Sequence, residues 1–291
     1  MSPLFDWAHI QWHLDPVALQ LGPLAVRWYG LMYAIAFGIG YWLTNLRLRK
    51  EPWEFTREQI DSVLTWLVLG VLVGGRTGYV FFYGWDYFSQ HPLEIVLPIS
   101  FQGGFHFTGI SGMSFHGGLF GITMAGVIFA RIHHLRASRL IELIVPAVPL
   151  GYTFGRLGNF LNGELWGRPT SAAWGMYFPH DPKGDLLQGR LGPLRHPSQL
   201  YEAFGEGLLL GLFLWFFRNR APFRGRMLSS YLMGYGIIRF FIEFTREPDV
   251  QVGFLLGTGW LTMGQTLCLA MIAVGAILWF FPVRGNAVEA D

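Results

Sequence analysis

The residues best suited to chemistry gather where an apolar run ends, in the segment GYTFGRLGNFLNGELWGR, residues 151–168. Within nine residues this segment carries Arg156, Asn159, Asn162 and Glu164. Arg156 and Asn159 are three residues apart, so on a helix they share one face. The glycines between them let another backbone or a lipid head group approach closely. Because a guanidinium in hydrocarbon must find an anion, carbonyl groups or water, the segment predicts a polar site in a membrane protein.

Two histidines lie beside other apolar stretches. His116, in the run GMSFHGG, has an imidazole that suits a general base near neutral pH. An isolated histidine at a membrane boundary is more often a structural hydrogen-bonding group, and Ser114 need not face it. His196, in HPSQLYE, precedes a Pro-Ser pair that is typical of a helix start, which favours a structural role. From the residues alone, both roles stay open for His116.

The composition indicates the class of protein that must position these residues. Of 291 residues, 52% are hydrophobic and only 14% are charged, whereas a soluble domain has about 25% charged residues. The mean hydropathy is +0.36. A net charge of +2 is too small to indicate a nucleic-acid partner. The single cysteine, Cys268, permits no internal disulfide, so helix packing must hold the chain together. We predict an all-α integral membrane protein.

About seven apolar stretches are close to the roughly 20 residues that a helix needs to cross a hydrocarbon core of about 30 Å. They cover residues 24–46, 60–82, 113–130, 140–160, 200–217, 227–244 and 261–281. Pro146 and Pro149 predict a kink in the fourth stretch. The polar residues 159–199, rich in Gly and Pro, predict a small head outside the membrane. We expect this head to be an insertion in a single polytopic membrane domain of residues 1–291.

The basic residues predict the orientation of the chain. Lys and Arg gather in the loops after the first, third and fifth stretches and in the C-terminal tail. Short loops with such an excess remain in the cytoplasm. We therefore expect a periplasmic N-terminus and head, and a cytoplasmic C-terminus.

With this orientation, four arginines fall in the outer half of the membrane: Arg27, Arg76, Arg156 and Arg239. Three carboxylates fall in the same half, Glu202, Glu206 and Glu243. Arg239 and Glu243 are one helical turn apart, so they can neutralise each other. Such pairing would neutralise most of the charge. Any single arginine could instead extend its guanidinium group to the membrane interface. The convergence of arginines on one leaflet still indicates an anionic ligand, for which lipid phosphate is the obvious candidate.

Six segments occur in the order found in the bacterial prolipoprotein diacylglyceryl transferase family, which the chain resembles over nearly its whole length. They are residues 27–33, 74–79, 113–118, 155–167, 196–202 and 235–246. The run GRLGNFLNGELWG is very specific, whereas SFHGG and HPSQLYE alone are weaker. The resemblance implies a multi-pass enzyme of the bacterial inner membrane with seven spans.

The resemblance also implies a reaction and its partners. The enzyme would move the sn-1,2-diacylglyceryl group of phosphatidylglycerol onto the thiol of the lipobox cysteine in a prolipoprotein signal peptide. The products would be a thioether and glycerol phosphate, in the first step of lipoprotein maturation. Membrane lipids would be further partners, and no nucleic acid is expected. No Cys/His/Asp ligand set suggests a metal and no nucleotide-binding motif occurs, so we expect no cofactor.

Residue by residue, the resemblance implies catalytic roles for His116, Arg156 and Arg239. It implies substrate-binding roles for Arg156, Tyr29, Asn159, Glu164, Gly167, Tyr235, Glu243 and Arg246. The chemistry agrees with these roles. The thiolate is the reactive form of cysteine, so a base such as His116 would help to generate it. A departing phosphate monoester needs cations, which the two catalytic arginines would supply.

Two stretches depart from the family pattern. Residues 101–111 lengthen the loop before SFHGG, which could change access to the site, and residues 170–195 are variable. Two other classes remain as alternatives. A lipid transporter or flippase would also place arginines in a membrane cavity. An intramembrane serine protease would use Ser114, but Ser114 does not lie in a Gly-x-Ser-Gly motif.

Overall fold

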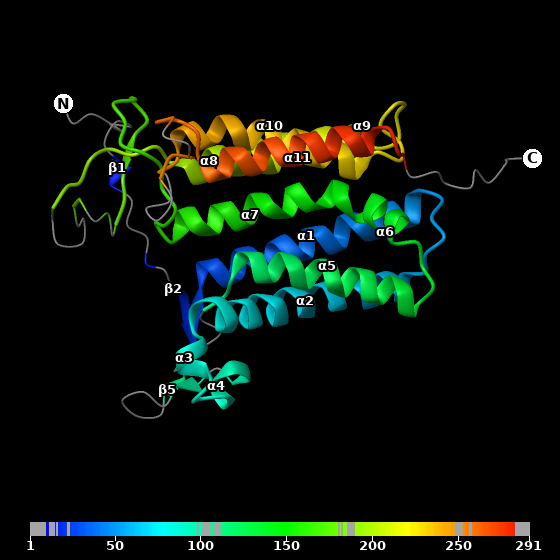
Figure 1. Ribbon diagram of the computed structural model, residues 1–291, viewed down its shortest axis with the longest axis horizontal. Coiled ribbons are helices and arrows are strands. Elements are labelled where there is room, and N and C mark those ends of the chain that lie inside the picture. The colour runs from blue at the N-terminus through cyan, green and yellow to red at the C-terminus, as the bar shows by residue number, and fades with distance from the viewer. Residues whose placement is uncertain are drawn as a thin grey trace, which may run out of the picture. The chain divides into compact units, whose positions relative to one another are not determined.

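The structure is a computed structural model that describes residues 10–11, 15, 17–21, 24–97, 99–100, 106–107, 112–179, 181, 183–184, 190–247, 253–255 and 258–282. Most of these residues lie in helices (Figure 1). The contacts divide the chain into two compact units: Met1–Leu46 with Ile141–Asp291, and Arg47–Leu140. Of the 101–111 loop, only residues 106–107 are among the described residues.

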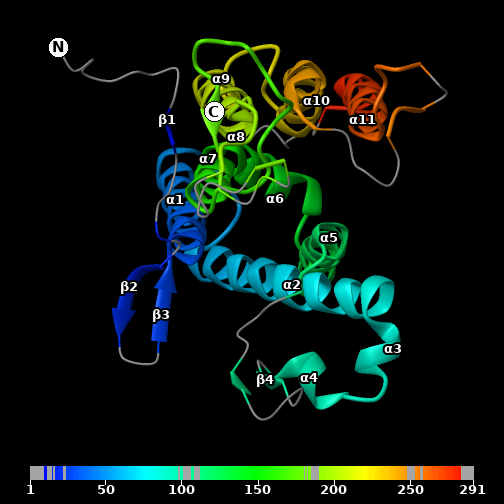
Figure 2. The ribbon, with the colours of Figure 1, turned by 90° about the vertical axis from the view of Figure 1, so that its left-hand side faces the viewer.

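The first unit begins with short strands and ends in a group of long helices. Its elements are β1 (Ile10–Gln11), β2 (Val17–Leu21), β3 (Leu24–Arg27), α1 (Trp28–Lys50, which runs into the second unit), α6 (Ala137–Ile144, which begins in the second unit), η2 (Val145–Ala147), α7 (Val148–Leu161), β6 (Met176–Tyr177), α8 (Ser198–Glu202), η4 (Ala203–Leu209), α9 (Leu210–Phe217), α10 (Met227–Ile242), η5 (Glu243–Thr245) and α11 (Met263–Trp279). Helices α10 and α11 run side by side in both ribbon views (Figures 1 and 2). Helix α7 packs against α8 and η4.

The fourth and fifth predicted spans are interrupted, each in its own way. In the fourth, the 3-10 turn η2, which contains Pro146, lies between α6 and α7; the kink expected at the prolines stays a prediction. The fifth opens at Ser198, as the Pro-Ser pair predicts, but continues through the wide π-helical turns of η4 before α9. Nothing in the sequence pattern predicted this π-helix. Such wide turns are frequent at functional sites.

Glycines bring α1 and α7 close together in the first unit. A Cβ atom at Gly151 would lie 3.0 Å from the carbonyl oxygen of Ala36. A Cβ atom at Gly158 would lie 3.2 Å from the side chain of Met32 and 3.4 Å from that of Tyr29. The glycines of α7 therefore allow α1 to lie close, and they bring Tyr29 of α1 near Gly158, two residues after Arg156.

The second unit consists of two long helices and the segment between them. Its elements are α2 (Arg57–Tyr83), α3 (Trp85–Phe88), α4 (Leu93–Val96), β4 (Ile99–Ser100), β5 (His106–Phe107) and α5 (Phe115–Ile132). Thr56 starts α2 through a capping box with Gln59. Gly74 of α2 and Gly121 of α5 face each other so closely that a Cβ atom at Gly74 would lie 2.7 Å from the Gly121 Cα. This small-residue contact joins the two helices.

In the part of the chain that the structure describes, three short strand pairs supplement the helices. The all-α prediction did not include these strands. Strand β1 pairs in parallel with β6, Ile10 opposite Met176. Strands β2 and β3 pair antiparallel, with Leu21 opposite Leu24, and β4 pairs antiparallel with β5. All these strands lie between helices or before the first one, where pairing satisfies backbone donors and acceptors.

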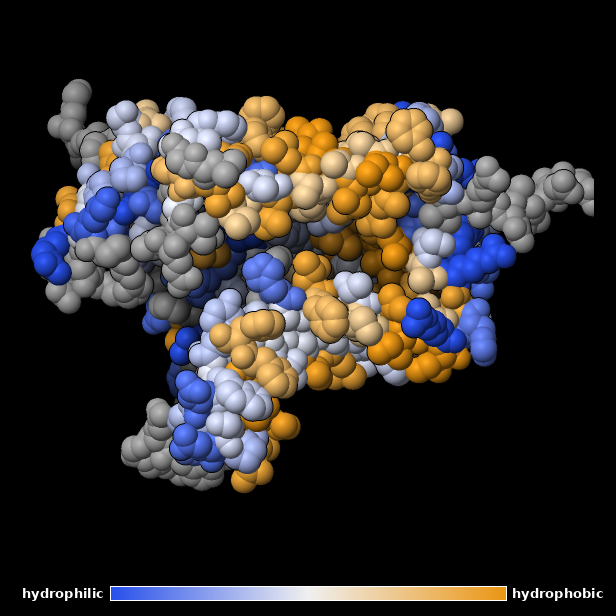
Figure 3. Space-filling view, viewed as in Figure 1, coloured by the Kyte–Doolittle hydropathy of each residue, from blue (hydrophilic) through white to orange (hydrophobic). Residues whose placement is uncertain are grey.

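The helices have the apolar character of membrane segments. Within the described ranges, three helical stretches are long and apolar enough to cross a membrane: Arg57–Tyr83, Ala137–Leu161 and Ser198–Phe217. They match the second, fourth and fifth predicted spans. Two shorter apolar helices, His116–Ile132 and Met263–Trp279, match the third and seventh. Many large apolar side chains on these helices are exposed, and Figure 3 shows hydrophobic residues gathered over the helices around α10 and α11. A lipid environment accounts for this surface, because soluble monomers rarely expose such large apolar areas.

Candidate active site

One face of α7 carries the start of the site. Tyr152, Arg156 and Asn159 follow at helical spacings of four and three. The Arg156 Nη1 donates to Asn159 Oδ1 at 3.3 Å, so the predicted shared face is confirmed. Asn159 Nδ2 in turn donates to Glu164 Oε1 at 2.8 Å.

The end of α7 explains how Glu164 returns to Asn159. Gly163 adopts a left-handed conformation with φ of 66°, which is the usual end of a helix. The Gly163 N–H donates to the Phe160 carbonyl, and the Glu164 N–H donates to the Asn159 carbonyl. This reversal of the chain turns the Glu164 side chain back over the last helical turn.

Glu202, at the end of α8, is the centre of the polar cluster and is completely buried. Its Oε2 lies 2.8 Å from Arg156 Nε. Its Oε1 lies 2.9 Å from Arg239 Nη1 and also pairs with Arg246 Nη1. One carboxylate therefore joins guanidinium groups from α7, from α10 and from the residue that follows η5.

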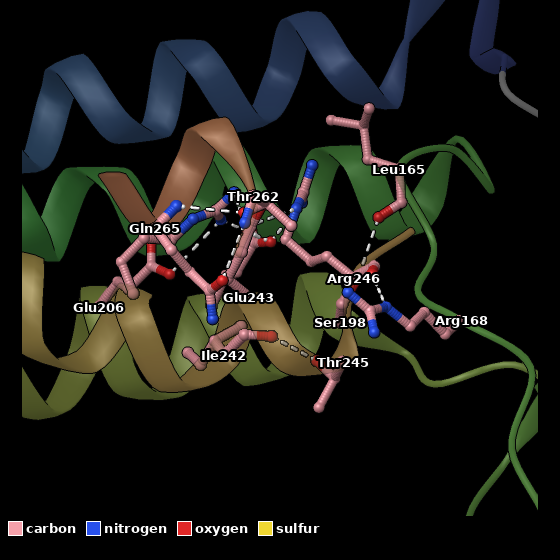
Figure 4. A network of polar contacts seen from close by, with 12 residues as sticks. Leu165, Arg168, Ser198, Glu206, Ile242, Glu243, Thr245, Arg246, Thr262 and Gln265 are labelled. Carbon is pink, nitrogen blue, oxygen red and sulfur yellow. Dashed lines mark hydrogen bonds and ion pairs between the residues drawn. The ribbon is translucent and has the colours of Figure 1, made fainter. Parts of the chain in front are cut away.

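Two more carboxylates surround Arg239. Its Nη2 pairs with Glu243 Oε2 at 2.9 Å, and its Nη1 lies 3.6 Å from Glu206 Oε1. The predicted pairing of Arg239 with Glu243 is thus confirmed. Glu243 is also 3.5 Å from Arg246 Nε and accepts a hydrogen bond from Thr262 Oγ1 at 3.0 Å. Figure 4 shows the side chains of this cluster turned toward one another.

The charges in this cluster balance, but its exposed part is cationic. Three guanidinium groups face three carboxylates, so pairing absorbs the charge as the sequence suggested. The arginine side chains nevertheless keep exposed fractions of 14% to 19%, whereas the side chains of Glu202 and Glu206 have 0%. An anion that approaches the cluster would therefore meet guanidinium N–H groups. Arginine forks match phosphate oxygens in geometry as well as charge.

Two other predicted residues, Tyr29 and Tyr235, contact α7 beside this cluster. Tyr29 of α1 packs near Gly158 and shares a 3.1 Å hydrogen bond with the Tyr33 hydroxyl. The Tyr235 ring meets the Tyr152 ring edge to face at a centroid distance of 6.0 Å.

Gly167 supports the backbone beside Arg246. Its N–H donates to the His196 carbonyl at 2.8 Å, and it forms an antiparallel bridge with Arg246. A Cβ atom there would collide with the Thr245 carbonyl oxygen. The absence of a side chain at Gly167 therefore allows the chain that carries Arg246 to lie close.

His116 lies in the second unit, at the beginning of α5, and its side chain is exposed. The arginine cluster lies in the first unit, so the role of His116 as base stays a prediction. Ser114 is buried and caps α5, where its hydroxyl accepts from the Gly117 N–H at 3.3 Å. This contact accounts for Ser114 as a structural residue.

Of the four arginines expected in the outer half of the membrane, Arg156 and Arg239 lie in this cluster of the first unit. Arg76 belongs to the second unit, where it donates to the backbone carbonyls of Ile95 at 2.9 Å and Glu94 at 2.5 Å. It thereby ties α4 to α2. Arg27 is exposed at the end of β3. Arg246, outside the predicted spans, takes a place beside the two clustered arginines.

Sequence reasoning missed Arg195, which organises the head. Its guanidinium is buried, pairs with both oxygens of Asp181, and lies 2.8 Å from Glu247 Oε2. It also lies 3.9 Å from the centroid of the Trp166 ring. Burial opposes the charge of this pair, but the ion pair dominates: it raises the pKa of Arg195 and lowers the pKa of Asp181. Only the residue type offered a signal, because nothing in the sequence shows that these side chains meet.

His196 has the structural role that the sequence favoured. Its Nδ1 and the Tyr201 hydroxyl are 3.1 Å apart, and its carbonyl holds the Gly167 N–H. Burial lowers the pKa of His196. Among the described residues, no group of three or more His, Cys, Asp and Glu side chains is arranged to hold a metal ion.

The fold and the site together define a helical membrane protein with a buried arginine–glutamate cluster whose accessible side is cationic. The sequence pattern of the prolipoprotein diacylglyceryl transferase family matches residues 16–281. The chain belongs to this family.

Individual relatives are similar over almost the whole chain. The phosphatidylglycerol–prolipoprotein diacylglyceryl transferase of Chlorobaculum tepidum is 49% identical over 276 residues, which cover 94% of this chain and 92% of the relative. The protein of the same name from Paracidovorax citrulli is 45% identical over 285 residues, with 94% and 98% covered. That from Nitratidesulfovibrio vulgaris is 44% identical over 274 residues, with 94% and 95% covered.

Proposed function

We propose that this protein transfers the sn-1,2-diacylglyceryl group of phosphatidylglycerol to the lipobox cysteine thiol of a prolipoprotein. The reaction forms a thioether and releases glycerol phosphate. One observation supports the proposal beyond family membership: the guanidinium groups of Arg156, Arg239 and Arg246 meet on Glu202, and these arginine side chains are 14% to 19% exposed whereas the Glu202 side chain is 0% exposed. A phosphate group of an anionic lipid fits such a surface.

The chemistry follows from the bonds that change. The thiolate sulfur attacks the glyceryl carbon that bears the phosphate, and a sulfur–carbon bond forms. The carbon–oxygen bond to the phosphate breaks, and its electron pair leaves with the phosphate oxygen. Arg156 and Arg239 stabilise the charge that develops on this oxygen. His116 accepts the proton of the thiol.

The remaining predicted residues position the two catalytic arginines or bind the lipid substrate. Asn159 and Glu164 keep Arg156 in place through a chain of hydrogen bonds. Glu243 and Arg246 do the same for Arg239 from the other side. Tyr29, Gly167 and Tyr235 complete the substrate-binding set at the edge of the cluster.

The proposed topology is a single polytopic domain of residues 1–291 with seven spans in the bacterial inner membrane. Seven described stretches support it: α1, α2, α5, α6 with α7, α8 through α9, α10, and α11. The N-terminus and the head of residues 159–199 lie in the periplasm, and the C-terminus lies in the cytoplasm. The distribution of Lys and Arg supports this orientation.

Thioether formation separates this proposal from the lipid-transporter alternative, which nothing in the comparisons supports. The purified protein is placed in proteoliposomes that contain phosphatidylglycerol and a lipobox peptide, and the peptide mass is measured. We expect a mass gain of one diacylglyceryl unit, which disappears when phosphatidylcholine replaces phosphatidylglycerol. Movement of labelled lipid between leaflets without any peptide mass gain would contradict the transferase and favour transport.

A further inference from the structure

Five residues of the first unit form a closed ring of polar contacts. Arg156 Nε lies 2.6 Å from the Tyr152 hydroxyl, which lies 2.6 Å from Glu206 Oε2. The other oxygen of Glu206 is 3.6 Å from Arg239 Nη1. Glu202 closes the ring, since it contacts both arginines at 2.8 and 2.9 Å. The two arginines are therefore linked twice, once through Glu202 and once through Tyr152 and Glu206.

The direction of the hydrogen bonds in this ring is fixed. A guanidinium only donates, so the Tyr152 hydroxyl must accept from Arg156. The single hydroxyl proton is then free to be donated to Glu206, which accepts it as a carboxylate. The Tyr152 hydroxyl therefore accepts a hydrogen bond from Arg156 and donates its only proton to Glu206.

Charge neutralisation alone does not explain this arrangement. Glu202 and Glu243 already supply contacts under 3 Å to Arg156 and Arg239. Tyr152 carries no charge, yet its hydroxyl stands between Arg156 and Glu206. Glu206 reaches this position from the π-helical η4, one turn beyond Glu202 at the end of α8. A second link between the two arginines restricts their separation and the directions of their N–H groups.

We propose that Tyr152 and Glu206 are positioning residues for the arginine pair. They act through Arg156 and Arg239 and do not touch the reacting atoms. The π-helical turn serves to bring Glu206 into the ring. This inference rests on the proposed transferase function, because it concerns how the two arginines meet the departing phosphate. Preorganised donors are effective because they need no rearrangement as charge develops.

The Tyr152→Phe variant tests the inference, because it deletes one oxygen and retains the ring that packs on Tyr235. We expect kcat for thioether formation to fall about tenfold or more, since a hydrogen bond to a charged group is lost. The KM for phosphatidylglycerol should change less. The matched control is Tyr231→Phe. The aromatic ring of Tyr231 also contacts that of Tyr235, at a centroid distance of 5.8 Å, but Tyr231 is not one of the five residues of the polar network. Thermal unfolding of both variants in detergent checks that each is folded.

A double variant distinguishes positioning from general destabilisation. Tyr152→Phe and Glu206→Gln interrupt the same link, so the variant with both changes should have nearly the kcat of the worse single variant. Independent structural damage would instead multiply the two losses. The inference is overturned if Tyr152→Phe equals Tyr231→Phe in kcat, or if the two losses multiply. If the parent protein forms no thioether at all, the proposed function fails instead, before the variants are compared.

Discussion

The contact between α2 and α5 predicts a sharp difference between two alanine substitutions on the same helix. In Gly121→Ala, the new methyl group would overlap the carbonyl oxygen of Gly70 and lie 2.8 Å from the Gly74 Cα. Both neighbours are backbone atoms, so only a separation of the helices can relieve the clash. In Gly118→Ala, the methyl group would lie 3.7 Å from the Val71 carbonyl oxygen, which is ordinary contact.

The magnitude follows from two effects. Both substitutions gain about 1 kcal/mol of helix propensity, and this gain cancels when the variants are compared. Overpacking costs about 1–3 kcal/mol and applies to Gly121→Ala alone. The free energy of unfolding should therefore be about 1–3 kcal/mol lower for Gly121→Ala than for Gly118→Ala.

Equilibrium unfolding in mixed micelles, followed by circular dichroism, measures this difference. The Gly118→Ala variant serves as the control for the loss of a glycine in α5. Equal free energies of unfolding for the two variants would refute the close approach of α2 and α5 at Gly121.

Three further predictions concern single residues. The pKa of Asp181 is lower in the folded head than its reference value near 3.9; its ion pair therefore stabilises the head at higher pH, and this contribution is lost as the pH falls through the lowered pKa. Asp181→Asn should remove this acid-dependent part of the stability, as limited proteolysis of the head across pH values would show. His116→Gln should slow thioether formation by about 10²–10⁴-fold if the imidazole is the base, and near-normal turnover would exclude it as an obligatory base. Ser114→Ala should retain activity and reduce stability by about 1 kcal/mol through the lost cap; complete inactivity of a folded variant would favour a serine nucleophile.

The apolar helices and two local contacts of the cluster were predictable from sequence. Apolar length is a local property, so the long helices appear where hydropathy places them. Arg156 and Asn159 share a face because three residues separate them, and Arg239 and Glu243 pair because one turn separates them. In each case the two residues are neighbours in the chain.

The contacts that the sequence did not specify join residues far apart. Glu202 meets Arg246 across 44 positions, and Tyr152 meets Glu206 across 54. These separations are far longer than the three or four residues that bring side chains together on one helix. Only the packing of the helices brings these residues into contact. For the same reason the sequence did not show that Arg76 donates to the backbone carbonyls of Ile95 and Glu94.

Arg156 offers the most direct test of the claim that the arginine cluster stabilises the departing phosphate. Thioether formation is measured in proteoliposomes with phosphatidylglycerol and a lipobox peptide, for the parent, for Arg156→Ala and for Arg220→Ala. Arg220 is an exposed arginine beyond α9 and outside the cluster, so its substitution controls for the loss of one positive charge. We predict that Arg156→Ala, shown to be folded by circular dichroism, loses about 10²–10³-fold in kcat, while Arg220→Ala retains the rate of the parent. Turnover by Arg156→Ala within about threefold of the parent would contradict the account, since the loss of one preorganised donor predicts a much larger effect.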